Sequence, residues 1–397
     1  MQRSGACFPS QARVDYVGIG RHLDGPALDP IQGVLEILDR ASMTGTNKLG
    51  VLLALLDIAP EPIQDNQPIS RRTLAERCLN LHWEHGRPYG DRMLRQSSSK
   101  KKRSDNTIAD DTTVMQNVHE LRDLLRKRSR GDIQHQSFEV VSHKMRSPEQ
   151  GDDWDRALDR SLARIERDLW RNPVSKLQAL PGEPGPFLYS LEGSQIRFLP
   201  GVAEQLTKYS GVLRPLIEFR FAQLVTKING EYLNAPDFDI HEHLFGRDRM
   251  MPPDSIRVGL AKLQGGRCIL TGRQIRRDNS SLDHVIPWSR TRLSAIENFI
   301  ITTSSVNSSK SDSLLGPDLI DRWLCYLDDK SEQIVELADA NNWPTDSDRV
   351  SSIALHIYEV LDPAVGVWQG DDGVQPLGDL GKTRIMSVLR ERVSRDM

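Results

Sequence analysis

The sequence lacks the features that mark a disulfide framework, a membrane span or a basic surface. It has four cysteines in 397 residues, Cys7, Cys78, Cys268 and Cys325, and they show no paired spacing, which favours a reducing cytoplasm. The longest apolar stretch, Leu49 to Ala59, is too short to cross a bilayer, and the first residues contain no run of the signal-peptide kind. The net charge of -3 excludes nucleic-acid binding through a globally basic surface. We therefore expect a soluble cytoplasmic protein without a membrane partner.

What the chain does contain is a polar pattern between Ser281 and Asp312, set among apolar runs. Residues 282–288 are predicted to form a strand, because Val285 and Ile286 are β-branched. A second strand is predicted over residues 299–303, after which Ser304 or Ser305 offers an N-cap for a short helix. The expected order is strand, loop, strand, helix.

Three side chains in this pattern suit the hydrolysis of a phosphodiester. His284 titrates near neutral pH and can take a proton from water. Asp283 supplies an anionic oxygen and Asn307 a neutral amide oxygen, which together suit Mg²⁺ with most of its waters retained. Neighbours on a strand point to opposite faces, so Asp283 and His284 are expected to approach a phosphate from two sides.

Together with Asn298, these residues resemble the HNH nuclease family and its ββα-metal fold. The spacing of Asn307-Ser-Ser-Lys310-Ser-Asp312 is most similar to the HNH domain of the RNA-guided CRISPR effector nucleases, and the resemblance covers about thirty residues. It implies that Asn298 ties the loop down and orients His284. It also implies 5′-phosphate and 3′-hydroxyl products without a covalent intermediate, and a Mg²⁺ cofactor with Mn²⁺ as a substitute.

The sequence departs from the family in one respect. Many HNH domains are held together by a zinc ion bound to two cysteine pairs, but the first pair here corresponds to Cys268 and Thr271, and the helix offers no cysteine. We therefore expect no structural zinc. The unit must be held by packing against neighbouring helices, and Leu319, Trp323 and Leu327 are placed to cover the open back of the hairpin.

Basic residues outnumber acidic ones around the motif. Residues 265–312 hold seven Lys and Arg against four Asp and Glu, an excess of three positive charges. Predicted contacts to the DNA phosphate backbone are Arg276, Arg277, Arg290, Arg292 and Lys310. Any one of these arginines could instead lie on a solvated loop face without contacting DNA.

The expected fold is mostly α (α+β), in three regions. Residues 1–180 form a helical sensor, partner or DNA-binding region with a basic polar loop near 97–111. A Pro-rich boundary at 172–186 precedes the HNH unit with its supporting helices at 187–330, and residues 331–397 form a helical cap. Predicted hairpin strands are 187–191 and 195–199, and predicted helices include 31–41, 47–58, 70–85, 114–128, 154–170, 201–209, 212–229, 254–263, 317–327, 332–340, 350–361 and 379–393.

One helical face in the first region presents Cys78, His82 and His85. These are three potential metal ligands, but no fourth is evident nearby, so a buried cysteine with two partly exposed histidines is the favoured interpretation. The same helix, capped by Ser70, could belong to a winged-helix-like DNA reader, although a plain packing helix is favoured.

The sequence thus predicts an HNH endonuclease that hydrolyses DNA. By fold-level analogy it resembles bacterial anti-phage defence or restriction effectors, whose partners include other defence-system proteins. Two alternatives remain: a nucleic-acid-binding module that no longer cuts, and an RNA-directed nuclease or toxin.

Overall fold

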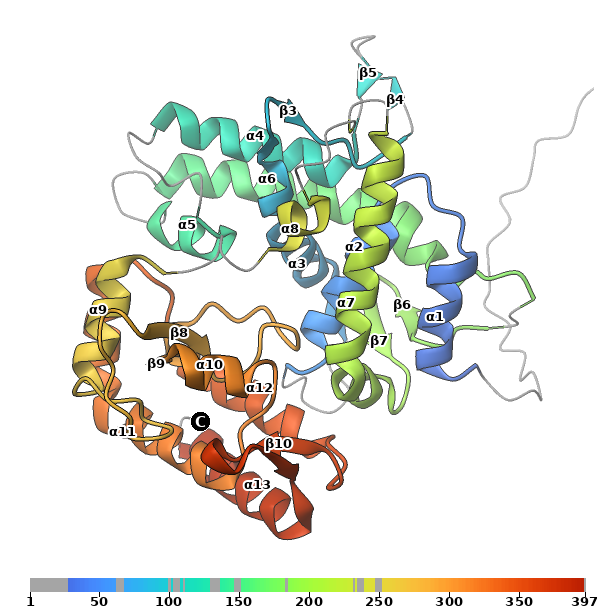
Figure 1. Cartoon of the computed structure of the whole chain (residues 1–397). Coiled ribbons are helices and arrows are strands. Elements are labelled where there is room, and N and C mark those ends of the chain that lie inside the picture. Colours follow the sequence, from blue (N-terminus) through green and yellow to red (C-terminus); the bar gives the residue numbers. More distant parts are fainter. Residues whose placement is uncertain are drawn as a thin grey trace, which may run out of the picture.

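The computed structural model describes residues 28–61, 68–98, 101–102, 108–109, 111–128, 136–145, 151–182, 185–230, 233, 239–246 and 252–395. They form two lobes, with mostly helices and only short sheets, as the predicted class requires (Figure 1). The first 27 residues and most of the basic loop near 97–111 lie outside the described residues; within that loop, Lys101–Lys102 pairs with Ile108–Ala109 as strands β4 and β5.

The first lobe is built around α2, whose apolar residues face all sides and are nearly all buried. Helices α3 and α7 pack against it. The helices of this lobe are α1 (Pro30–Arg40), α2 (Asn47–Ile58), α3 (Arg71–Trp83), α4 (Thr113–Arg128), α5 (Phe138–Met145), α6 (Gly151–Leu169), α7 (Val202–Ile228) and α8 (Ile240–Phe245). Its remaining strands are β1 (Ile69–Ser70), β2 (Pro88–Tyr89), β3 (Arg92–Met93), β6 (Tyr189–Glu192) and β7 (Gln195–Phe198), with β1, β7 and β6 in one sheet.

The Pro-rich segment 172–186 does not separate two cores. The Gln178 side chain accepts hydrogen bonds from the backbone N–H groups of Phe187 (3.0 Å) and Tyr189 (3.1 Å), and the Tyr189 hydroxyl donates to the Val174 carbonyl. The described part of this segment thus folds back onto the first lobe. One apolar core runs from Val34 to Phe245, and the second runs from Ile256 to Leu389 with one contribution from α5.

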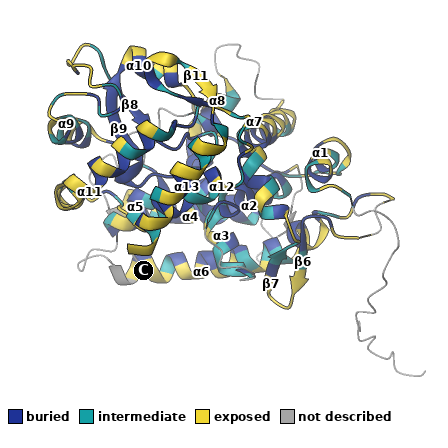
Figure 2. Ribbon diagram, turned by 90° about the horizontal axis from the view of Figure 1, so that it is seen from below, coloured by how far each residue is buried: buried dark blue, intermediate teal, exposed yellow. Residues whose placement is uncertain are grey.

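The second lobe contains the predicted strand, loop, strand and helix, surrounded by helices (Figure 2). Both strands are largely buried, while α9, α11 and α13 turn exposed faces to solvent. Its elements are α9 (Asp254–Leu263), β8 (Ser280–His284), β9 (Phe299–Thr303), α10 (Ser304–Lys310), α11 (Pro317–Ala340), α12 (Ser347–Glu359), β10 (Gly366–Trp368), β11 (Val374–Pro376) and α13 (Gly378–Arg395).

Hydrogen bonds and packing hold the β8–β9 hairpin in place where related domains use zinc. Gln264, just after α9, bonds to both backbone groups of Ile301 at 2.7 Å. The Cys268 thiol lies 3.2 Å from the Thr302 hydroxyl, and the Trp323 indole donates to the Glu297 carbonyl at 3.1 Å. Leu319, Trp323 and Leu327 of α11 are buried in the same core as the hairpin.

Ion pairs join the two lobes. Arg349 of α12 pairs with Glu61 at 2.7 Å, and Arg292 of the loop after β8 donates to Glu218 of α7 at 3.0 Å. The lobes therefore meet beside the predicted active site. No helix within the described ranges is long and apolar enough to cross a membrane.

The two histidines, His82 in the last turn of α3 and His85 in the short 3-10 turn that follows it, differ from the interpretation favoured by the sequence. His82 and His85 are fully buried rather than partly exposed, and they pack against Phe221 in the first core. The His82 ring bonds through Nδ1 to the Cys78 carbonyl at 2.7 Å, and this contact fixes the orientation of the ring. Among the described residues, no group of three or more His, Cys, Asp and Glu side chains converges to hold a metal.

Candidate active site

Strands β8 and β9 pair antiparallel, with Asp283 opposite Ile300 and His284 opposite Phe299. β8 ends at His284 and not at Trp288, because the next residues turn to meet the side chain and carbonyl of Asn298. Helix α10 follows β9 directly. Its cap is Thr303, whose hydroxyl accepts from the Val306 N–H at 3.3 Å, one residue earlier than the predicted serines.

Asn298 is fully buried, and its hydrogen bonds hold the loop between β8 and β9 in place. Its side-chain oxygen accepts from the Ile286 N–H at 2.8 Å, and its amide nitrogen donates to the carbonyls of Ile286 (3.2 Å) and Leu293 (3.4 Å). Its own carbonyl accepts from the Val285 N–H at 2.9 Å. The side chain faces the loop and not the cavity described next.

A cavity of about 190 Å³ opens where β8 ends and α10 passes over it. Asp283, His284 and Asn307 all line it, together with Trp288 and Asp312. The structure therefore brings three of the four predicted catalytic side chains to one small polar space, large enough for a phosphate group, while the fourth, Asn298, lies outside it.

The His284 ring is held by two aromatic neighbours. Its centroid lies 4.7 Å from that of Phe299, its cross-strand partner, and 5.5 Å from that of Trp288 in the loop. Rings at these distances and tilts restrict one another's rotation. The imidazole is half-buried and reaches the cavity at its edge.

Asp283 is buried against Lys310, which the sequence placed among the nucleic-acid contacts. Lys310 is fully buried; its Nζ lies 3.2 Å from the Asp283 carboxylate and donates to the His284 carbonyl at 2.8 Å. A short helix directly after β9 turns this lysine inward, so it serves as an internal counter-ion and not as a surface phosphate contact. Burial raises the pKa of Asp283; Lys310 acts in the opposite direction, and nearby Asp312 adds to the rise.

The oxygen donors in the cavity fit a magnesium ion. Asn307 donates its amide N–H to the Ser281 hydroxyl at 2.8 Å, which leaves its carbonyl oxygen as the free end of the amide. With the Asp283 carboxylate this gives one anionic and one neutral oxygen ligand, and Mg²⁺ usually keeps several of its waters when protein supplies so few. Within the described ranges, no cluster of cysteines and histidines of the kind that favours zinc adjoins these ligands.

The four predicted arginine contacts lie in different environments. Arg276 and Arg277 are exposed in the turn before β8, at the opposite end of that strand from the cavity, roughly 13 Å away along β8. Arg292 is buried on Glu218 and lies over the Phe245 ring, so it is an interlobe contact and not a free cation. Arg290 is partly buried in a second cavity between the lobes.

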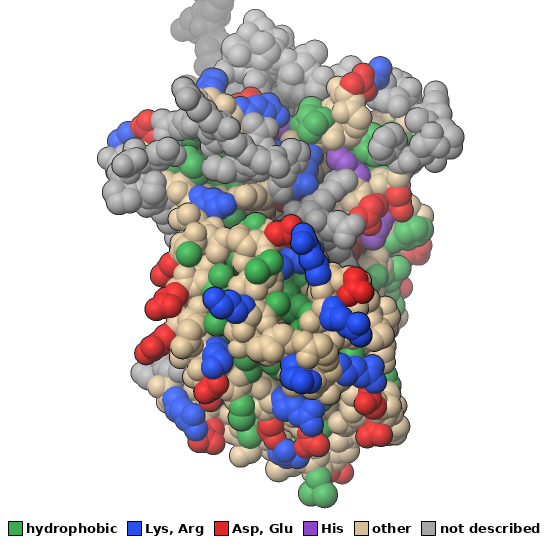
Figure 3. Space-filling model, turned by 60° about the vertical axis from the view of Figure 1, so that its left-hand side comes forward, with side chains coloured by type: hydrophobic (Ala, Val, Ile, Leu, Met, Phe, Trp, Pro, Cys, Tyr) green, Lys and Arg blue, Asp and Glu red, His purple; other side chains and the backbone are tan. Residues whose placement is uncertain are grey.

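Charge on the surface is mixed. On the face drawn in Figure 3, Lys and Arg side chains alternate with Asp and Glu over the described residues, without a broad area of one sign. Contacts to a polyanion must therefore be local, as the net charge of -3 already indicates.

Fold and site together define a ββα unit with an Asp-His pair on its first strand and an asparagine on its helix. Residues 268–314 match the family model described as HNH endonuclease, which agrees with the resemblance found in the sequence. This match indicates nuclease activity on nucleic acid. It does not single out the CRISPR effector nucleases within the family. No curated protein and no solved structure shows a significant match to the chain.

The sequence did not point to several residues around the site. Trp288 and Phe299 pack against the His284 ring, but in the sequence they belong to ordinary apolar runs. Glu218 and five other residues of α7 line the neighbouring cavity between the lobes from more than sixty positions upstream, and no local pattern could connect them with the site. The signal in the sequence was the Asp283-His284 pair within an apolar run, and the structure places this pair at the end of β8 beside the cavity.

Proposed function

We propose that this protein is a metal-dependent HNH endonuclease that hydrolyses the phosphodiester bonds of DNA. The observation that carries the proposal is that Asp283, His284 and Asn307 line one polar cavity within the segment that matches the family. Asp283 and Asn307 would hold a Mg²⁺ ion, with Mn²⁺ as a substitute. When bound, the ion supplies positive charge to the scissile phosphate and to the oxygen that leaves it.

His284 accepts a proton from the attacking water, whose oxygen forms the new bond to phosphorus. The bond from phosphorus to the 3′ oxygen breaks, and that oxygen gains a proton from solvent, which yields a 5′-phosphate and a 3′-hydroxyl. Phe299 and Trp288 limit the rotation of the His284 ring. Asn298 positions Trp288 by fixing the loop that carries it, so its role is in positioning.

Lys310 keeps the Asp283 carboxylate in place inside the unit. A carboxylate buried without a counter-charge would shift toward its neutral form and lose its value as a metal ligand. The lysine at 3.2 Å opposes that shift, so both residues support the cavity even though only Asp283 is proposed to bind the ion.

The biological setting that we propose is anti-phage defence or restriction in the cytoplasm, with the first lobe as the sensor or partner-binding part. This extension rests on analogy between folds alone. Its test is phage plating on cells that express the wild type or the His284→Ala variant. Protection that requires His284 would support a defence role, and equal plating on both strains would contradict it.

The enzymatic proposal is tested with a supercoiled plasmid and a labelled RNA, each incubated with protein and Mg²⁺, Mn²⁺ or a chelator. We expect nicked or linear plasmid with either ion, intact plasmid with the chelator, and 5′-phosphate ends on the products. Cleavage of the RNA but not of the plasmid would indicate an RNA-directed nuclease instead. Binding without cleavage of either substrate would indicate a module that no longer cuts.

A further inference from the structure

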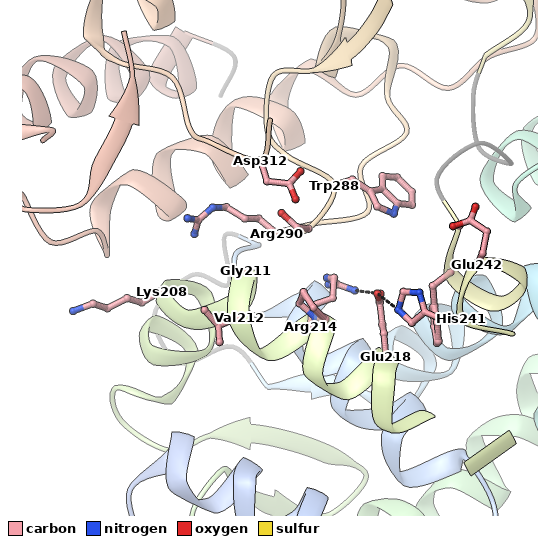
Figure 4. A pocket seen from close by; sticks show the side chains of 14 residues that line it. Lys208, Gly211, Val212, Arg214, Glu218, His241, Glu242, Trp288, Arg290 and Asp312 are labelled. Carbon is pink, nitrogen blue, oxygen red and sulfur yellow. Dashed lines mark ion pairs between the residues drawn. The ribbon is translucent and has the colours of Figure 1, made fainter. Parts of the chain in front are cut away.

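A second, larger cavity adjoins the catalytic one. It has a volume of about 680 Å³ and lies between the lobes, with α7 and α8 on one side and residues 288–290 on the other (Figure 4). Trp288 and Asp312 line both cavities, so the two spaces are neighbours. A strand whose scissile phosphate sits between Asp283 and His284 must place its next nucleotide somewhere close by, and this cavity is the adjoining space.

Arg290 enters this cavity from the loop after β8. Its guanidinium lies against α7 at Gly211, where an added Cβ would be only 3.8 Å from the Arg290 Cζ. Its Nε and Nη1 are shielded from solvent and have no hydrogen-bond partner among the described residues. Burial also lowers the pKa of Arg290, and Tyr358 and Asp312 offset this only in part. Burying an N–H donor without an acceptor costs free energy, and an anion bound in the cavity would supply the missing acceptor.

The other arginines near this cavity each form an ion pair with a carboxylate of the protein, whereas Arg290 forms none with the described residues. Arg214 pairs with Asp57, and Arg292 donates to Glu218 at 3.0 Å. Lys208 of α7 lies toward the same end of the cavity as Arg290 (Figure 4), with its ammonium 5.6 Å from the ring centre of Tyr209. Arg290 and Lys208 are therefore the cations that the cavity offers to a phosphate.

The rest of the lining suits a nucleobase. Val212, Pro215, Phe245 and Trp288 provide apolar surface, and Val212 is 70% exposed at the rim. Glu242 and Asp312 provide carboxylates, which can accept hydrogen bonds from the amino groups of bases. A volume near 680 Å³ is typical of a pocket that encloses one small molecule, so it holds one or two nucleotides of a strand and not a duplex.

We propose that the interlobe cavity binds the nucleotide next to the scissile phosphate in an unpaired strand, with the adjoining phosphate on Arg290 and Lys208. This inference rests on the proposed function. The first lobe then forms one wall of the substrate site through α7, and the enzyme acts on a strand that is single or locally opened. Bases stack on apolar and aromatic surface in many single-strand sites, where cations follow the backbone.

The test is fluorescence anisotropy with a labelled single-stranded DNA of about 16 nucleotides and with the same sequence as a blunt duplex. His284→Ala protein is used so that no cleavage occurs during titration. We expect the single strand to bind more tightly than the duplex. Arg290→Gln should weaken single-strand binding about tenfold and lower the slope of log affinity against log salt by about 0.7, the value for one lost phosphate contact.

Three further variants separate a contact from a general fault in folding. Arg290→Lys keeps the charge and should restore most of the affinity and of the salt slope. Val212→Trp fills the rim without removing any charge and should also weaken single-strand binding. Arg197→Gln removes an arginine that pairs with Glu192 on the β6–β7 hairpin, away from both cavities, and should leave binding within about twofold.

The inference is overturned if Arg290→Gln keeps the wild-type affinity and salt slope, or if the duplex binds as tightly as the single strand. Cleavage by the wild type is measured separately. A protein that cuts while Arg290→Gln binds normally disproves the cavity assignment and leaves the nuclease assignment intact. A wild type that cuts neither DNA nor RNA with any divalent ion disproves the nuclease assignment, and the assignment of a substrate cavity fails with it.

Discussion

Lys310 Nζ lies 3.2 Å from the carboxylate of Asp283, and both side chains are buried at the wall of the candidate active-site cavity. The pair joins the helix of the ββα unit to its first strand. It also places a fixed positive charge beside the proposed metal ligand, so the same contact serves the fold and the site.

Replacing the lysine by an apolar residue should therefore destabilise the protein. Lys310→Met leaves a buried carboxylate without its counter-charge, which typically costs about 3–5 kcal/mol. We expect a loss of this order in the free energy of unfolding, measured with urea in metal-free buffer. Asp283→Asn combined with Lys310→Met should recover most of it, because no buried charge remains. Lys330→Met, which removes a surface lysine beside Asp329, is the matched control; equal stability of both lysine variants would contradict the argument.

Asn298 should matter more for stability than an asparagine in an exposed turn of the same lobe. Asn298→Ala removes three hydrogen bonds within a fully buried loop, and each buried group left without a partner costs about 1–3 kcal/mol. Asn279→Ala removes an acceptor for the Arg276 N–H in the turn before β8 and should cost less than about 1 kcal/mol. Thermal melting of the two variants checks the order, and a larger loss for Asn279→Ala would refute it.

Acid should destabilise the first lobe through its buried histidines. Burial lowers the pKa of His82 from 6.5 to about 4, and the pKa of His85 falls in the same direction. The unfolded chain binds protons at pH values where the fold keeps these rings neutral, so the free energy of unfolding decreases as pH falls from 6.5 toward 4. For His82 alone the loss amounts to roughly 3 kcal/mol.

Urea unfolding curves recorded at several pH values from neutral to about pH 4 measure this dependence. His82→Gln should flatten the pH dependence of stability, whatever its own cost at neutral pH. His143→Gln, at an exposed histidine of α5, should leave the dependence unchanged. A pH dependence that is the same for His82→Gln and the wild type would show that His82 does not cause it.

A chelator of transition metals should not unfold the second lobe. The Cys268 thiol is in contact with the Thr302 hydroxyl. Hydrogen bonds from Gln264 and Trp323 hold the hairpin where many HNH domains use a zinc ion. We expect an unchanged melting temperature with phenanthroline and no stoichiometric zinc by elemental analysis. One bound zinc per chain, or melting at a lower temperature with the chelator, would be inconsistent with this account.

The ββα unit could be predicted because its signals are local. The β-branched run at 299–303 gave β9 its bounds, and the polar pair Asp283-His284 in an apolar run identified the first strand, although β8 ends at His284 and not at Trp288 as expected. The predicted hairpin of β6 and β7 was also confirmed. It could be predicted because Gly193 provides the positive φ that its turn requires. These features depend on a few neighbouring residues and on little else.

Long-range arrangements could not be predicted in the same way. Two helices were expected at 201–209 and 212–229, but α7 continues through Gly211 and Pro215 because packing in the core outweighs the lost backbone hydrogen bond. The helices expected at 317–327 and 332–340 likewise form one helix, α11. The burial of Lys310 and Arg292 depends on partners at Asp283 and Glu218, and no pattern of charge along the chain identifies such pairs.

The most direct test of the account is the rate of plasmid cleavage by His284→Ala beside the wild type and His143→Ala, with Mg²⁺ at neutral pH. General-base catalysis contributes about 10²- to 10⁴-fold, so we expect the rate of His284→Ala to fall by that factor while His143→Ala cuts at the wild-type rate. Melting curves establish that all three proteins are folded. Undiminished cleavage by folded His284→Ala would contradict the assignment of this imidazole as the base and, with it, the proposed active site.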